Sequence, residues 1–328
     1  MCEVGEIVRS GPPAAPAGDA AEVELPDLTL RPHLLGAGFS DDELRRLVRT
    51  GRLTPVRRGA YVQGDLPDDL LARHTLQIAA AMRELAGDAV VSHISAAVLH
   101  GLRIWGVPLG RVHVTRRRAG GGRRGALVHV HVAALDPAEI TMIAGLPVTS
   151  PARTVADLAR MVPFEQAVVV ADSALFYQRP DRVELGDLVD VLEAVPRRPG
   201  TRAARRVIEF SNGLSESVGE SRSRVAIAAA GLPIPVLQWE VRASATGRFI
   251  GRVDVGWPEL RTVGEFDGLV KYGRTLRPGQ DIAEVLVEEK LREDALRDED
   301  LAVVRWIWSD LANFAPTASR LRSRFRRI

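Results

Sequence analysis

The feature that most constrains the fold is a pair of strand patterns between Arg248 and Tyr272, joined by a Trp-Pro-Glu turn. Asp254 lies on the first strand, and Glu265 and Asp267 lie on the second. Because side chains alternate between the two faces of a strand, Glu265 and Asp267 share one face. A hairpin folded about the middle of this turn would place Asp254 directly opposite Glu265.

The same register gives the hairpin one acidic and one apolar face. Val253 and Val255 would share the apolar face with Phe266, while three carboxylates crowd the other. Like charges that face each other across strands are destabilising. A divalent cation between them is the simplest explanation, since carboxylate oxygens suit Mg²⁺. The alternative is that these acids are merely solvated on an exposed face. A register slip of one residue would also move every side chain of the strand to the other face of the sheet.

Length and composition indicate a globular protein with several domains. The chain has 328 residues and 46% hydrophobic residues, which predicts two or three domains of about 100–200 residues. No apolar run approaches the ~20 residues of a membrane span, and the N-terminus lacks a secretory pattern. The only cysteine is Cys2, which excludes disulfides within the chain. We therefore expect a cytoplasmic protein without membrane contact.

The formal net charge of +2 is unevenly distributed along the chain. Residues 1–30 hold six acids and one base, so residues 31–328 carry a net charge of +7. Arginines cluster at 116–118 with 123–124, and again at 320–327. Such clusters suit phosphate, and Arg116 and Arg117 are candidate nucleic-acid contacts. A solvated loop and a frayed tail are the alternative interpretation.

Changes in composition predict four segments. They are a disordered tail at 1–26, a winged-helix domain at 27–66, an α/β middle domain with a linker at 67–200, and a final α/β domain at 201–328. The tail is rich in Ala, Gly, Pro and acids and has no apolar periodicity. The fold class is thus α/β, in several domains.

The pattern at 27–66 is typical of a winged helix. Ser40 and Glu43 form a capping box for a helix over 41–50, and a basic hairpin with Arg57 and Arg58 follows. In such a head the helix enters the major groove and the wing arginines lie near phosphates. The acids at 41–43 oppose this, because they would repel phosphate.

The middle region carries no nucleophile elbow, phosphate-binding loop or dinucleotide fingerprint. Gly120, Gly121 and Gly122 lack the Lys-Ser/Thr of a phosphate loop, so they predict a flexible basic turn. His129 and His131 share a strand face and could bind a metal together with His113. Alternating histidines on a solvent face are more common than ligands, so we do not expect a site there.

The last domain follows the order helix, three strands, helix, strand, helix, which predicts an α/β sandwich. This third of the chain resembles the very-short-patch-repair-like endonucleases of the PD-(D/E)XK superfamily. The resemblance lies in six ordered stretches: SESVGES, GLPIPVLQ, GRVDVGWP, EFDG, EKLRED and VVRWIWSDL. The N-terminal part, over about 28–175, is similar to AbiEi-type antitoxins of bacterial phage-defence systems. That similarity lies in GRLTPVRRGAYV, SHISAAVLHGL and GLPVTSPARTVADLA.

The nuclease resemblance implies a restriction-endonuclease-like site. Asp254 and Glu265 would hold Mg²⁺ or Mn²⁺, Asp267 would be a further ligand, and Glu220 would hold a metal-bound water. The usual lysine two residues after the glutamate is replaced by Asp267, so Lys271, or Lys290 on the next helix, would take its role. A metal-activated water would then hydrolyse a DNA phosphodiester.

Two functions follow as hypotheses. The first is a Mg²⁺-dependent DNA endonuclease of defence or repair type with a winged-helix DNA-binding head. The second is a non-catalytic AbiEi-like antitoxin or transcriptional regulator, whose degenerate nuclease fold serves as a scaffold and whose partner is a toxin. Convergence of the carboxylates of Glu220, Asp254 and Glu265 would favour the first.

Overall fold

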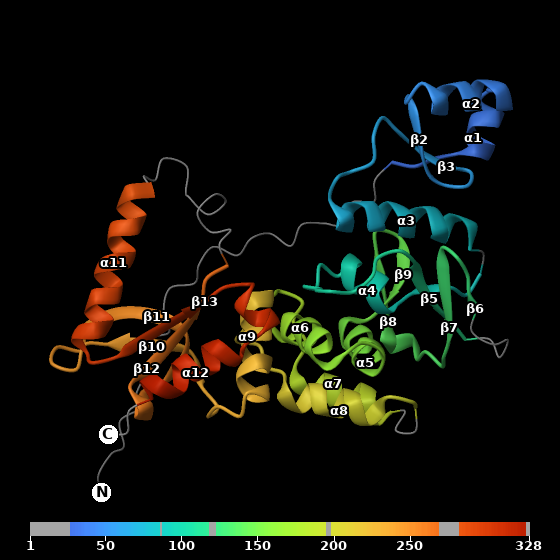
Figure 1. Ribbon diagram of the computed structural model, residues 1–328. Helices are drawn as coiled ribbons and strands as arrows, with labels where there is room; N and C mark the ends of the chain where they lie inside the picture. The colour runs from blue at the N-terminus through green and yellow to red at the C-terminus, as the bar shows by residue number, and fades with distance from the viewer. Residues whose placement is uncertain (1–26, 86, 118–122, 195–197, 269–281, 326–328) are drawn as a thin grey trace, which may run out of the picture.

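The computed structural model describes residues 27–85, 87–117, 123–194, 198–268 and 282–325. It is a mixed α/β protein in which helices pack around three sheets (Figure 1). The tail at 1–26 and Lys271 lie outside the described residues. Among the helices that are described, none is both long and apolar enough to cross a membrane.

The first unit is a small three-stranded sheet with two short helices. The sheet has the order β1-β3-β2, and the elements are β1 (Thr29–Leu30), α1 (Arg31–Gly36), α2 (Asp41–Arg49), β2 (Leu53–Arg57) and β3 (Ala60–Gln63). The predicted capping box starts α2. The backbone N–H of Glu43 donates to Ser40 Oγ over 3.3 Å, and the N–H of Ser40 donates to the Glu43 carboxylate over 2.8 Å.

The second unit is built on a six-stranded sheet of order β6-β7-β5-β4-β9-β8. Its strands are β4 (Val90–Val91), β5 (Val112–Arg116), β6 (Arg123–Arg124), β7 (Val128–Val132), β8 (Ile140–Ile143) and β9 (Leu146–Thr149). The helices α3 (Leu70–Glu84) and α4 (His93–Leu99) pack on this sheet, where Ile78 and Leu99 meet Val114 and Val148 in one apolar cluster.

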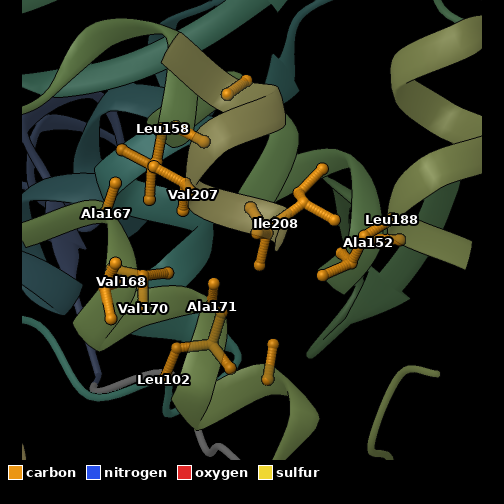
Figure 2. Close-up of a cluster of buried hydrophobic side chains, with 14 of the residues drawn as sticks. Leu102, Ala152, Leu158, Ala167, Val168, Val170, Ala171, Leu188, Val207 and Ile208 are labelled. Atoms are coloured by element: carbon orange, nitrogen blue, oxygen red, sulfur yellow. The ribbon is translucent and has the colours of Figure 1, made fainter. Parts of the chain in front are cut away.

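A helical layer continues from α4 through α5 (Pro151–Met161), α6 (Phe164–Leu175), α7 (Leu185–Glu193) and α8 (Thr201–Phe210). Its core joins Leu158, Val168 and Leu188 to Val207 and Ile208 of α8 (Figure 2). The boundary that the sequence placed between residues 200 and 201 therefore falls inside a packed unit. The linker pattern misled because it says nothing of the apolar face that α8 buries.

The third unit is a sheet of order β10-β11-β12-β13 with helices on both faces (Figure 1). Its elements are α9 (Val218–Ala229), β10 (Val236–Arg242), β11 (Phe249–Trp257), β12 (Thr262–Phe266), α11 (Ile282–Asp298), β13 (Ala302–Trp306) and α12 (Ala315–Arg324). On one face, α9 and α12 pack against Val255, Phe266 and Trp306. On the other, Leu296 of α11 packs against Val253 and Val263.

The predicted shared face of Val253 and Val255 is wrong. Val253 packs with Leu296 of α11, whereas Val255 packs with Trp306 on the opposite face. The strand changes face at Asp254, which lies opposite Gln238 in the register of β10 and β11. Gln238 has a φ of 49°, so the regular alternation is interrupted on both strands at this point.

We predict that Gly219→Ala destabilises the third unit. A Cβ atom at Gly219 would lie 1.9 Å from Cε1 of Phe266, which is buried. Overpacking of this kind costs about 1–3 kcal/mol, and chemical denaturation followed by tryptophan fluorescence would measure it. Gly186→Ala on α7 is the control, because no atom lies within 4 Å of its Cβ position. Equal stability of Gly219→Ala and the wild type would contradict the packing described.

Candidate functional site

The predicted acidic residues lie on or next to three elements of the third unit. Glu220 is on α9, Asp254 is on β11, Glu265 is on β12, and Asp267 follows β12 directly. The pairs Val255–Gly264 and Trp257–Thr262 fix the register of the hairpin. Asp254 and Glu265 lie directly beyond the last pair of this register.

The Asp254 carboxylate accepts a hydrogen bond from the backbone of the neighbouring strand, β12. The paired positions of β11 and β12 end at Val255 and Gly264. Beyond them, the Asp254 Oδ2 atom accepts a hydrogen bond from the Phe266 backbone N–H over 2.8 Å. The carboxylate therefore satisfies a backbone donor that would otherwise be buried without a partner.

Glu265 is neutralised by two arginines. Its Oε1 accepts from Arg292 Nη1 of α11 over 2.7 Å, and its Oε2 accepts from Arg305 Nε of β13 over 3.0 Å. Only 12% of the Glu265 side chain is exposed. Hydrogen bonds from Arg292 to Glu289, and then to Glu265, raise the pKa of this guanidinium. Both oxygens of Glu265 are thus held by permanent cations.

The two arginines extend the network along α11. Arg292 also bonds Glu289 over 2.7 Å, and Arg305 bonds both Glu289 and Glu293. The basic residue that faces Glu265 is therefore Arg292, while Lys290 is exposed on α11. Sequence reasoning missed Arg292 because the superfamily pattern led the search toward lysines.

Glu220 is held apart from this network by its own hydrogen bonds. Its carboxylate accepts from the Glu216 N–H over 2.8 Å, from Ser217 Oγ over 2.7 Å and from Gln238 Nε2 over 2.8 Å. Burial raises the pKa of the Glu220 carboxyl, although the hydrogen bonds from Glu216 and Ser217 oppose this. Gln238 is a further site residue, since it joins Glu220 to the strand position opposite Asp254. Its signal in the sequence was its place at the end of GLPIPVLQ.

The described carboxylates do not form a group that one divalent ion could bridge. Groups of at least three His, Cys, Asp or Glu side chains close enough to hold one metal ion are rare in the part of the chain that the structure describes. Within the described ranges there is one such group, and it consists of His93, His113 and His131. Asp267 donates its backbone N–H to Trp306 O over 2.8 Å and is partly exposed. As arranged, these residues do not fit Mg²⁺, because Glu265 already has two arginine partners.

The three acids at the start of α2 are each engaged by a neighbouring residue. Asp41 accepts a bidentate bond from Arg31, with two contacts of 2.7 Å. Asp42 is bound by Arg45 over 2.7 Å. Glu43 is engaged in the capping box, and hydrogen bonds from the Ser40 backbone and hydroxyl lower its pKa. The expected repulsion of phosphate by this helix start is therefore reduced.

A basic cleft lies between α2, the β2–β3 hairpin and the end of α3. Arg49, Arg58 and Arg83 line it, together with the paired Arg31 and Arg45. Arg49, Arg58 and Arg83 are exposed. In the part of the chain that the structure describes, none of the three has an acidic partner within ion-pair distance. The cleft therefore has an excess of positive charge.

The four predicted nucleic-acid residues are placed differently from one another. Arg58 lines the cleft, but Arg57 forms an ion pair of 2.7 Å with Glu84 of α3 and is largely buried. Arg116 lies 3.7 Å from Asp88, and Arg117 is exposed just after β5. Arg57 thus joins the first unit to α3 in this structure, a contact that the local pattern could not reveal.

We predict that Glu220→Gln makes the protein relatively more stable as pH rises. A raised folded-state pKa means that the folded chain holds the Glu220 proton more tightly than the unfolded chain does. Stability is therefore lost in the wild type as pH rises from the ordinary value of 4.5 through the folded-state pKa. The glutamine has no charge to desolvate and keeps an acceptor for Gln238.

Urea unfolding of wild type and Glu220→Gln at pH 4 and pH 8 tests this. The difference in unfolding free energy between the two should shift in favour of the variant at pH 8. Glu259→Gln, at an exposed turn, controls for the loss of charge. A shift in the opposite direction would show that Glu220 is stabilised as a carboxylate.

Comparison with known proteins identifies relatives of the chain. No protein-family model matches it. Two proteins of Mycobacterium tuberculosis, uncharacterized protein Rv2248 of strain H37Rv and uncharacterized protein MT2308 of strain CDC 1551, are each 31% identical over 225 residues. The match covers 68% of this chain and 76% of each relative. The crystal structure of the Rv2827c protein of the same species covers 68% of this chain and 86% of its own, with 17% identity and a TM-score of 0.37. The chain belongs to the family of the uncharacterized protein Rv2248.

Proposed function

We propose that this chain is a DNA-binding regulator of the AbiEi-like antitoxin type, with a nuclease-like domain that serves as a scaffold. The observation that carries the proposal is the basic cleft of the first unit. Arg49, Arg58 and Arg83 line it without acidic partners in the described residues, while Asp41 and Glu84 beside them are neutralised by Arg31 and Arg57.

The arrangement of the first unit supports a winged-helix head. Its two helices are followed by the β2–β3 hairpin, and β1 adds to the edge of β3. In that interpretation α2 is the helix that enters the major groove, and Arg58 on the hairpin lies near a phosphate. Arg49 at the end of α2 would contact the backbone and position the helix, whereas base contacts would set the operator sequence.

The third unit supports the scaffold half of the proposal. Its order of helix, three strands, helix, strand and helix is the order that the sequence pattern predicted. Glu265 is bound by Arg292 and Arg305, and Asp254 by a backbone N–H. Acids used in this way stabilise the sheet, so no hydrolytic step is assigned to them. A toxin of the nucleotidyltransferase class is the partner that the antitoxin resemblance suggests.

We predict that Arg49→Ala combined with Arg58→Ala weakens DNA binding. Each lost phosphate contact reduces the salt dependence of the binding constant, so the log–log slope should fall by about 2. Affinity at low salt should fall roughly tenfold or more. Fluorescence anisotropy with the DNA upstream of the gene, at several salt concentrations, measures both quantities.

The matched control is Arg202→Ala combined with Arg205→Ala on α8, where both side chains are exposed far from the cleft in sequence. This variant carries the same change in net charge and should retain the wild-type slope. If both double variants lose affinity equally, binding comes from general charge and the cleft has no special part.

A metal-dependent endonuclease is the second candidate function. One observation favours it: Asp254 and Glu265 lie on neighbouring strands directly beyond the last paired positions, and Gln238 of β10 is bonded to Glu220. Hydrolysis would require Glu265 to exchange its arginine partners for a metal ion. Arg292 and Arg305 would then be free to contact a DNA phosphate.

The regulator proposal predicts no metal-dependent nicking of supercoiled plasmid. Wild type, Asp254→Asn and Glu265→Gln should give the same background conversion in Mg²⁺ or Mn²⁺ over hours. Agarose gels read at matched protein concentration measure it. Nicking by the wild type at least tenfold faster than by both variants would replace the regulator with the nuclease.

A further inference from the structure

Four histidines meet on one face of the middle sheet. His113 on β5 lies opposite His129 on the parallel strand β7, and His131 lies two residues further along the same strand. His93, the first residue of α4, covers them, with its ring stacked on that of His131 at 3.6 Å between centroids. The face that the sequence suggested to be solvated is therefore covered by a helix.

Three of these side chains have the spacing of a metal site. One ligand nitrogen from each of His93, His113 and His131 lies within 4.8 Å of the other two, and His113 Nδ1 is 3.0 Å from His131 Nε2. Two nitrogens about 2.0 Å from one tetrahedral ion lie roughly 3.3 Å apart. Because a metal ion lies in the plane of each imidazole that binds it, binding requires the His93 and His131 rings to rotate out of their stack.

The surrounding protein encloses two of the three side chains. His93 and His113 are only 8% and 7% exposed. The nearby cations Arg153 and Arg160 are paired with Asp157, and Arg153 also with Glu139.

A hydrogen-bond partner for the second ring nitrogen of His93 is also present. Ser92 Oγ lies 2.9 Å from His93 Nδ1 and accepts a hydrogen bond from Thr115 Oγ1 over 2.8 Å. A histidine that binds a metal through one nitrogen usually donates the other N–H to such an acceptor. His93 also has a φ of 53°, a conformation uncommon for a residue with a side chain. This backbone holds the ring over the sheet, as strained residues at sites often do.

A pocket gives solvent a path to the cluster. It is lined by His113 and His129 together with Arg111, Gln166, Met161 and Pro108. The pocket therefore reaches His113, one of the three proposed ligands. Imidazole nitrogens suit Zn²⁺, Ni²⁺, Cu²⁺ and Co²⁺ better than they suit Mg²⁺.

We propose that His93, His113 and His131 form a binding site for one divalent transition-metal ion, with Zn²⁺ as the best match. The ion would join α4 to β5 and β7 and so stabilise the middle unit. This site is separate from the acidic residues of the third unit, and it does not depend on the DNA-binding proposal.

Titration of the full chain with Zn²⁺ after removal of metals by a chelator tests the proposal. The wild type should bind one ion per chain with a dissociation constant below about 10 μM, and its melting temperature should rise with added Zn²⁺. Replacement by Co²⁺ should give the visible absorption of a nitrogen-bound ion. Failure of the wild type to bind Zn²⁺ at 100 μM would overturn the proposal.

Variants locate the ion. His131→Gln, which is only half-buried, and His113→Gln should each weaken binding at least tenfold while the far-ultraviolet circular dichroism spectrum stays unchanged. His33→Gln, exposed on α1, and Asp254→Asn should bind as the wild type does. Binding that survives both His113→Gln and His131→Gln, or that is lost in Asp254→Asn, would place the ion elsewhere and refute the site.

Discussion

Two buried arginines on α9 hold the second and third units together. Arg224 bonds Asp172 of α6 over 2.6 Å, and Asp172 is fully buried. Arg222 bonds Glu165 over 2.8 Å and stacks over the Trp105 ring at 3.7 Å. Removing one partner of a buried pair leaves an uncompensated charge, which costs about 3–5 kcal/mol. The helix that carries Glu220 is therefore fixed to the middle unit as well as to its own sheet.

The same helix anchors the sheet of the third unit. Trp306 donates its indole N–H to Ser223 Oγ over 2.7 Å, so α9 is tied to β13 at a fully buried position. Arg305, the residue before Trp306, points to the other face and binds Glu265. The placement of the acidic network on the α11 side thus follows from the apolar packing on the α9 side. The role that this geometry gives Glu265 is to stabilise the sheet through its ion pairs.

Local patterns in the sequence predicted the parts of the fold that depend on neighbouring residues. The capping box at Ser40 starts α2, and the Trp-Pro-Glu turn joins the two strands that carry Asp254 and Glu265. The change of face at Asp254, the attachment of α8 to the middle helices and the pairing of Arg57 with Glu84 depend on distant contacts. The spacing of residues in the sequence gives no signal for these three features.

The candidate sites show the same division. Asp254 and Glu265 could be found because they are close in sequence, but the arginines that neutralise Glu265 lie 27 and 40 residues away from it. His129 and His131 share a strand, yet the site needs His93 from another element. The sequence pattern of these histidines predicts a solvated face, and only the position of α4 shows that the face is covered.

The use of charge in the chain favours binding over hydrolysis. Many acids of the described residues are paired with arginines of the same chain: Asp41 and Asp42 in the first unit, Glu84, Asp157 and Asp172 in the second, Glu265 and Glu289 in the third. A hydrolytic site needs carboxylates left available for a cation, whereas phosphate recognition needs arginines left available for an anion. Since residues 31–328 carry an excess of seven positive charges, pairing of the acids leaves arginines at the surface. Arg49, Arg58 and Arg83 gather in the cleft beside α2, which is the surface that the DNA-binding proposal uses.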